Sequence, residues 1–228
     1  MTAVSAWDRD LEALPAAAWP DFVTEHSGLP GPRADLSLVQ AVAVRADTEV
    51  VEALLAHGGE FATMCAAAAV GRRADEPSCE GTAHALAADE RWRVREGVAI
   101  GLQLLGDRDS ATLFAIARRW VDDPDPLVQR AAVAAVCEPR LLRTADAAAT
   151  AIAVCDRATQ RLMSLPAERS RRPDARTLRQ ALGYAWSVAV AADPRPGLEA
   201  FGALDTTIPD NARLVTQHRR KRRLAVLL

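Results

Sequence analysis

The segment from Asp89 to Asp107 reads DERWRVREGVAIGLQLLGD, and the segment from Asp123 to Pro139 reads DPDPLVQRAAVAAVCEP. When Val94 is placed over Val128, an offset of 34 residues, both segments begin with aspartate and reach a β-branched residue five positions later. Both then continue as a run of small and apolar residues. Recurrence at such a spacing indicates a helical repeat, in which each unit buries its apolar face against the next.

Weaker copies of the pattern occur along the chain. Leu38-Val39-Gln40 resembles Leu127-Val128-Gln129, and the pairs Pro173-Asp174 and Pro209-Asp210 are each followed by a leucine. The successive intervals are 55, 34, 50 and 36 residues, so the period is loose.

The composition favours helices. Alanine, the best helix former, accounts for 48 of the 228 residues, whereas aromatic residues make up only 4%. Proline and glycine fall between apolar-periodic segments, which is where helices end. The sequence predicts an all-α fold with helices near 4–14, 16–26, 35–45, 48–57, 60–71, 77–88, 92–105, 109–122, 126–137, 144–165, 173–191, 196–204 and 209–225.

The repeated segments resemble the HEAT-repeat family, whose pattern is Asp-Pro or Asp-x, then Val-Arg, then small residues. The resemblance is strong over about 75–140 and extends more weakly over 35–225. It implies an α-α superhelix, a solenoid of antiparallel helix pairs with a concave surface for a partner. An ordinary helical bundle is the alternative. The residues that carry the resemblance are Asp89, Trp92, Val94, Arg95, Gly97, Leu102, Gly106, Asp123, Pro124, Val128, Arg130, Ala131 and Ala132.

Residues 1–34 differ from the rest and suit two short amphipathic helices followed by the turn-rich link 27–33. We expect them to form an N-terminal cap and linker in front of a repeat array over 35–228, the whole being a single compact domain. Within the repeats we expect one continuous hydrophobic core that links two repeats, and we expect buried, unreactive thiols at Cys65 and Cys137. The expected core residues are Val94, Val98, Leu102, Val128 and Val136.

The segment 92–96 is the first candidate binding site. Trp92 and Glu96 are four residues apart and share a helix face, and Arg95 lies between them. An aromatic ring, a carboxylate and arginines could hold a cationic base beside a phosphate backbone. Alternatively, Trp92 packs between repeats while Arg95 pairs with Asp89, as Arg130 would with Asp123, in a ladder between repeats.

A HEAT-like group, the alkylpurine DNA glycosylases, uses such an arrangement. This chain is similar to them in being all-helical, arginine-rich and built of loose repeats. Their aromatic-rich cleft and catalytic aspartate have no secure counterpart here, so no catalytic residue is carried over. If the likeness extended to function, Trp92, Glu96, Arg130 and Trp186 would converge in one cleft.

A second candidate lies on the predicted helix 173–191, which contains Tyr184 and Trp186. Residues two apart on a helix face different ways, so we expect one ring in the core and the other at the surface. A surface ring beside Arg179 would form a stacking platform for a base.

The charge distribution supplies a third candidate. The net charge of −2 divides into −10 over residues 1–139 and +8 over residues 140–228. Five consecutive cations, Arg219, Arg220, Lys221, Arg222 and Arg223, lie near the C-terminus and could contact a polyanion. Arginine accounts for 27 of the 28 basic residues. Either a GC-rich genome or selection for bidentate contacts with phosphate or carboxylate groups would explain this excess.

Motifs of common enzymes are missing from the sequence. The four histidines are scattered, and there is no HExxH, GxGxxG, Walker-type loop or GxSxG elbow. We expect no metal and no cofactor. The aspartates at 107, 109, 122, 123 and 125 fall at turns between predicted helices, which indicates N-capping more than acid–base chemistry. The four cysteines form no CxxC pair, and the N-terminus carries charges where a signal peptide needs an apolar run. We therefore expect a cytoplasmic protein with free thiols and no membrane contact.

Two functional hypotheses result. The first is a non-catalytic HEAT-repeat scaffold that binds a protein partner through its concave face and basic C-terminal half. The alternative is a nucleic-acid-binding protein, including one of the alkylpurine-glycosylase type. The sequence leaves the partner and the oligomeric state open.

Overall fold

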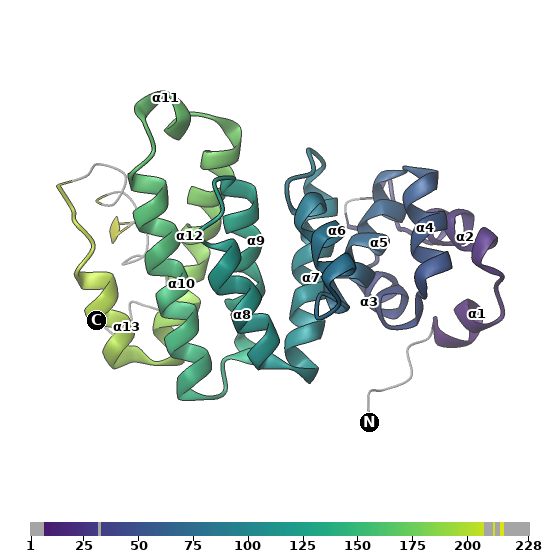
Figure 1. The fold of residues 1–228 in the computed structure, drawn as a ribbon, viewed down its shortest axis with the longest axis horizontal. Coiled ribbons are helices and arrows are strands. Elements are labelled where there is room, and N and C mark those ends of the chain that lie inside the picture. Colours follow the sequence, from purple (N-terminus) through teal and green to yellow (C-terminus); the bar gives the residue numbers. More distant parts are fainter. Residues whose placement is uncertain (1–6, 32, 208–211, 213–214, 217–228) are drawn as a thin grey trace. The chain divides into compact units, whose positions relative to one another are not determined.

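The computed structural model describes residues 7–31, 33–207, 212, 215 and 216, and this part of the chain contains helices and turns but no strand. The predicted all-α class is confirmed. The predicted helix 209–225 and the basic run 219–223 lie outside the described residues, except for 212, 215 and 216. The α-helices are α1 (Asp8–Glu12), α2 (Trp19–Glu25), α3 (Leu36–Arg45), α4 (Thr48–His57), α5 (Glu60–Arg72), α6 (Pro77–Ala87), α7 (Trp92–Arg108), α8 (Ser110–Trp120), α9 (Pro126–Val136), α10 (Ala145–Met163), α11 (Ala167–Ser170), α12 (Pro173–Ala192) and α13 (Pro194–Gly202) (Figure 1).

The predicted helices between residues 35 and 204 are all present, with small shifts at their ends. Two short elements were not predicted: the 3-10 helix η2 (Pro139–Leu141) and α11. The predicted helix 16–26 is divided into the 3-10 helix η1 (Ala16–Ala18) and α2. The predicted helix 4–14 is described only as the short α1.

The chain divides into two compact units, residues 1–105 (unit 1) and 106–228 (unit 2). The division falls within α7. The N-terminal segment belongs to unit 1, where α1 contacts α3 and α2 contacts α4 and α5. At its surface the rings of Trp7, Phe22 and His26 lie together, with centroids 4.4–6.1 Å apart.

Unit 1 is built around α5, whose residues from Phe61 to Gly71 are all buried. A helix that is apolar on every side must be surrounded, and α5 is in contact with α2, α3, α4 and α6. It also approaches α7 very closely, because Gly97 and Gly101 place bare backbone against Met64, Ala68 and Gly71. The small residues of the repeat pattern thus permit backbone-to-backbone contact.

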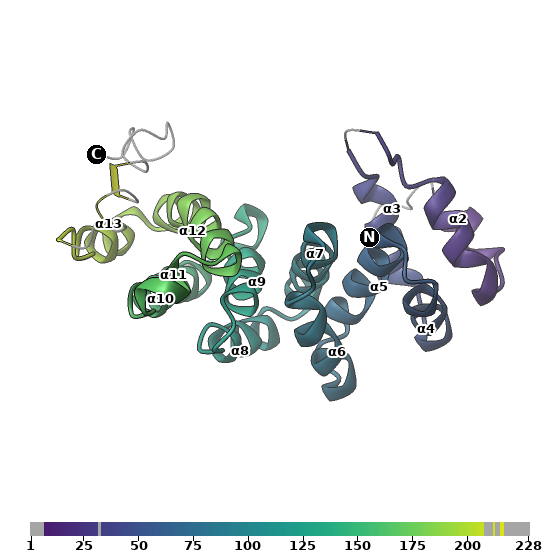
Figure 2. The ribbon, with the colours of Figure 1, turned by 90° about the horizontal axis from the view of Figure 1, so that it is seen from above.

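Unit 2 consists of two layers of helices. Helices α9 and α12 pack side by side in one layer, and α8 and α10 form the other (Figure 2). The two layers are in contact, because α8 packs against α9 and α10 packs against α12. Helix α13 continues the stack against α12 and α10. This arrangement is consistent with antiparallel helix pairs.

The residues expected in the core are buried, and two of the expected N-caps are present. Val94, Val98, Leu102, Val128 and Val136 are all buried, as are Cys65 and Cys137. The first three belong to unit 1 and the two others to unit 2. Asp109 and Asp125 accept backbone hydrogen bonds at the starts of α8 and α9, so the N-capping predicted for them is confirmed.

Candidate binding surface

The structure places the predicted site residues in both units. Trp92, Arg95 and Glu96 lie on the part of α7 that belongs to unit 1, while Arg130, Arg179 and Trp186 lie in unit 2. The residues 219–223 are outside the described part.

At the start of α7, Trp92 is 56% exposed, so the expectation that it packs between repeats is wrong. The guanidinium of Arg93 lies 4.7 Å from the centroid of the Trp92 ring, and its Nη1 forms an ion pair of 2.9 Å with Glu60. The Arg93 guanidinium thus contacts both the Trp92 ring and Glu60, the first residue of α5, while the Trp92 side chain stays exposed.

The arginines around Trp92 hold the turn between α6 and α7 together. Arg91 forms a two-pronged ion pair with Asp89, at 2.9 and 2.8 Å, and its Nη1 donates to the carbonyl of Gly58 at 2.8 Å. The hydrogen bonds and charge of Arg91 lower the pKa of Asp89 below its ordinary value, against a partial desolvation that raises it. Arg95 donates to the carbonyls of Asp89 and Glu90. Asp89 therefore pairs with Arg91, whereas Arg95 binds the Asp89 main chain.

Trp186 is not a surface residue. Its side chain is fully buried, its Nε1 donates to Thr159 at 3.0 Å, and its ring lies 5.4 Å from that of Phe201. The assignment of Trp186 to a binding site is corrected for this reason. Of the two aromatic residues on α12, the one at the surface is Tyr184, which is 53% exposed.

Tyr184 belongs to an exposed row along α12. Arg172 at the N-cap, Arg176, Gln180 and Tyr184 follow one another at intervals of four residues and are all exposed. Because a helix turns once in 3.6 residues, Ala191 lies on nearly the same side as Tyr184, seven residues earlier. We call these five residues the α12 face.

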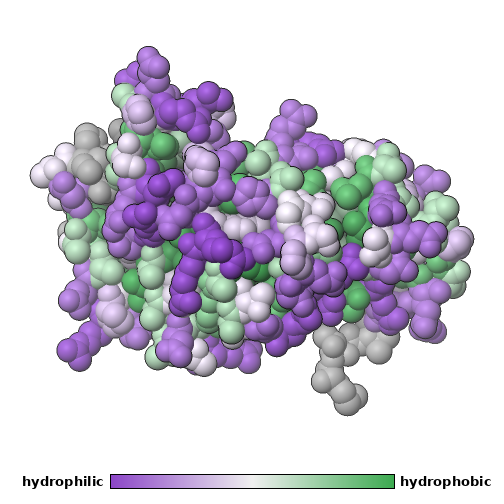
Figure 3. Space-filling model, in the orientation of Figure 1, coloured by the Kyte–Doolittle hydropathy of each residue, from purple (hydrophilic) through white to green (hydrophobic). Residues whose placement is uncertain are grey.

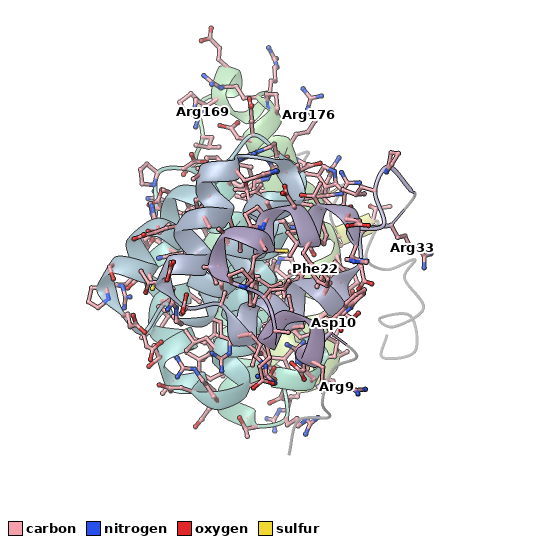
Figure 4. All side chains as sticks on the ribbon, turned by 90° about the vertical axis from the view of Figure 1, so that its right-hand side faces the viewer. Arg9, Asp10, Phe22, Arg33, Arg169 and Arg176 are labelled. Atoms are coloured by element: carbon pink, nitrogen blue, oxygen red, sulfur yellow. The ribbon has the colours of Figure 1, made fainter. Side chains whose placement is uncertain are left out.

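Arginines surround the N-terminal end of the α12 face. Residues 157–179 contain seven arginines and two acidic residues. Figure 3 shows hydrophilic residues gathered over the end of unit 2 that carries α11, and Figure 4 labels Arg169 and Arg176 at this end. The side chains of Arg171, Arg172 and Arg176 are exposed.

Some of these arginines also shape the loop between α11 and α12. Arg179 donates to the carbonyl and hydroxyl of Ser170 at 3.2 and 2.9 Å, and Arg169 pairs with Asp174 at 2.8 Å. Partial burial raises the pKa of Asp174, but the hydrogen bonds and charge of Arg169, the Ala175 N–H and the charge of Arg172 outweigh it. The pKa of Asp174 therefore lies below its ordinary value, and this carboxylate stays charged beside the arginines.

A pocket of about 320 Å³ lies at the other end of the α12 face; its side chains are all apolar, and main-chain polar atoms also reach its surface, and we call it the apolar pocket after its side chains. It is lined by Pro139 and Leu142, at η2, and by Val188, Ala191 and Ala192 of α12. The two wall segments are about 50 residues apart in sequence and are brought together because α9, which precedes η2, packs along α12.

A second, larger pocket of about 640 Å³ lies in the other layer, between α8 and α10. Its main polar contact joins Arg118 Nη2 to Thr150 Oγ1 at 2.8 Å, and small residues such as Ala111, Ala149 and Ala153 form much of the rest. No predicted site residue lines it.

Arg130 lies on α9, the helix beside α12, and is partly exposed. The described residues of the C-terminal half, 140–207, hold ten basic and seven acidic residues, a net charge of +3. Most of the predicted +8 therefore belongs to residues 208–228.

Chemical groups for catalysis or metal binding are not gathered in the described part of the chain. Ser187 is buried and its hydroxyl donates to the carbonyl of Tyr184. Among the described residues, no group of three or more His, Cys, Asp or Glu side chains could hold a metal ion. The described helices include none long and apolar enough to cross a membrane.

Comparisons with protein-family models, curated proteins and solved structures found no match to this chain.

Sequence reasoning did not single out Arg172, Arg176 or Gln180, and it did not find the apolar pocket. The sequence does indicate that Arg172, Arg176 and Gln180 belong together, because residues at every fourth position of a long helix form one row along it. The pocket has no such signal because its walls come from distant segments.

Proposed function

We propose that this chain is a non-catalytic helical-repeat scaffold, similar in kind to HEAT-repeat proteins, and that it binds a protein partner through the α12 face. The observation that carries the proposal is the exposed row of arginine, glutamine and tyrosine beside an apolar pocket. Tyrosine and arginine dominate the binding energy of protein interfaces, and an apolar centre with a polar rim is their usual composition. A cytoplasmic location is part of the proposal, because a reducing compartment would keep the four unpaired cysteines reduced.

The test is affinity purification from the cells that make the protein, comparing the wild type with Tyr184→Ala. Arg195→Glu, on the exposed part of α13, is the control. We expect a partner retained by the wild type and by the control to be lost with Tyr184→Ala. A partner set that is the same for all three proteins would contradict binding through the α12 face.

A second candidate is a nucleic-acid-binding function. The arginines of residues 169–179 and the exposed ring of Tyr184 favour it, because cationic side chains and an aromatic platform together bind single strands. The buried Trp186 weakens the glycosylase form of this candidate, which needs at least two exposed aromatic rings in one cleft. A glycosylase assay on methylated DNA tests it: release of a base above background would contradict the non-catalytic scaffold.

A further inference from the structure

The α12 face changes character along its length. Its first two residues, Arg172 and Arg176, are exposed cations, Gln180 and Tyr184 follow, and Ala191 opens onto the apolar pocket. At 1.5 Å per residue, Arg176 and Ala191 are about 22 Å apart along the helix axis. A ligand that uses the whole face must therefore be anionic at one end and apolar at the other.

We infer that the α12 face binds an acidic segment of a partner protein that inserts one apolar side chain into the pocket lined by Pro139, Leu142, Val188, Ala191 and Ala192. This inference rests on the proposed scaffold function and names the chemistry of its partner.

The pocket supplies the apolar anchor. Its volume of about 320 Å³ accommodates one large apolar side chain, and its lining consists of aliphatic residues and proline. Burial of such a side chain removes apolar surface from water, which favours binding. Tyr184, two turns of helix before Ala191, provides a flat wall for the segment next to the anchor.

The arginines supply the anionic end. Arg171, Arg172 and Arg176 are exposed, and within the described residues neither Arg171 nor Arg176 forms an ion pair with a carboxylate. The nearby carboxylate of Asp174 is held by Arg169 at 2.8 Å. Arg176 Nη2 donates to the Arg171 carbonyl at 3.0 Å, and its other N–H groups can donate to a glutamate or aspartate side chain of a partner.

Charge favours a short acidic segment over a nucleic acid. The positive field is local: the described residues as a whole carry 22 basic and 29 acidic side chains. The acidic turn between α8 and α9, with Asp122, Asp123 and Asp125, lies at this same end of unit 2, since Arg161 donates to its carbonyls. A long polyanion would extend to these aspartates, whose charge is of the same sign. A few carboxylates placed within one Debye length of the arginines, about 8 Å, would contact only the arginines.

The experiment is a selection of displayed random peptides of about 16 residues, a length that spans the face either as a helix or as an extended strand. The full chain is the bait. We expect selected peptides with acidic residues in one half and a single leucine, phenylalanine or methionine in the other. Their affinity should fall about tenfold or more with Arg176→Glu, and likewise with Ala191→Leu, which fills the pocket.

Arg195→Glu is the matched control for Arg176→Glu, since both replace an exposed arginine of unit 2, and it should leave affinity within about twofold. Equal thermal unfolding of all four proteins by circular dichroism shows that the variants fold. Selected peptides that lack acidic residues, or that bind every variant equally, would overturn the inference. An oligothymidylate that displaces the peptides and binds more tightly than they do would also overturn the inference. The surface would then be assigned to nucleic acid. If selection fails while a cellular partner is still lost with Tyr184→Ala, the inference is wrong and the proposed scaffold function stands.

Discussion

At the scale of the residue, burial decides what a charged substitution does. Val98 on α7 is completely buried, whereas Val44 on α3 is 48% exposed, and both belong to unit 1. Val98→Asp places an unpaired carboxylate in the core and should lower the free energy of unfolding by several kcal/mol, roughly 3–5. Val44→Asp should change it by less than about 0.5 kcal/mol. Urea unfolding of both variants measures the difference, and an unchanged midpoint for Val98→Asp would show that the residue is not in the core.

The thiols give a second prediction at this scale. Burial raises the pKa of Cys65, and burial together with the neighbouring Cys137 thiol, 3.5 Å away, raises that of Cys155. Since the thiolate is the reactive form, Cys65, Cys137 and Cys155 should resist a maleimide reagent in the native state. Cys79 is the least buried of the four and should react first. Mass spectrometry of the labelled protein, with a denatured sample as the control, checks the order; rapid native labelling of Cys65 would contradict it.

At the scale of the element, glycine sets the distance between α5 and α7. A Cβ at Gly97 would collide with the Met64 carbonyl oxygen, and one at Gly101 with the Ala68 carbonyl oxygen. Backbone atoms in packed helices cannot move aside cheaply, so Gly97→Ala and Gly101→Ala should each destabilise the protein by about 1–3 kcal/mol.

Gly81→Ala on α6 is the control, because a Cβ there meets no atom within 4 Å. Alanine is the better helix former, so this substitution should stabilise by up to about 1 kcal/mol. In chemical unfolding we expect Gly101→Ala to lower the free energy of unfolding and Gly81→Ala to raise it. Equal effects would mean that α5 and α7 are not in close contact.

The turn between α6 and α7 should make stability depend on pH. Arg91 lowers the folded-state pKa of Asp89, so the ion pair stabilises the fold above the ordinary carboxyl pKa of 3.8 and ceases to do so as the pH falls through the folded-state value. Asp89→Asn should lower Tm by about 2–4 °C at neutral pH and by progressively less below the ordinary carboxyl range. Glu52→Gln, at an exposed position on α4, is the control for the loss of one negative charge. A Tm difference that is the same at every pH would show that the Asp89 charge is not involved.

At the scale of the whole molecule, the net charge hides a strongly basic C-terminal segment. The five cations from Arg219 to Arg223 lie outside the described residues, and with Arg213 and Asp210 they give residues 208–228 a net charge of +5, out of +8 for residues 140–228. If they meet a polyanion, DNA or RNA should bind at low salt with a linear dependence of log affinity on log salt concentration.

Replacement of residues 219–223 by alanine and glutamine should then abolish most of this binding and make the salt dependence shallower. Electrophoretic mobility shifts at several salt concentrations, with duplex and single-stranded probes, measure both effects. Failure of the wild type to bind either probe at low salt would leave protein binding as the function of this chain.

Much of unit 1 and unit 2 was predictable because its causes are local. The signals that start and end a helix lie within the segment itself, as with the N-capping aspartates Asp109 before α8 and Asp125 before α9, so helix positions can be read without knowing the tertiary structure. The buried positions of Val94 and Val128 follow from the apolar periodicity of the same segments.

The helical class, most helix boundaries, the buried valines and the buried thiols could therefore be predicted from local sequence. Which aromatic side chain of α12 reaches the surface depends on packing between helices: Trp186 contacts Thr159 and Phe201 in the interior, and Tyr184 is exposed. Helical periodicity places the two rings on different sides but does not say which side another helix will cover. The apolar pocket likewise exists only because η2 and the end of α12, far apart in sequence, are packed together. Local structure depends on neighbours along the chain, whereas a binding surface depends on neighbours in space.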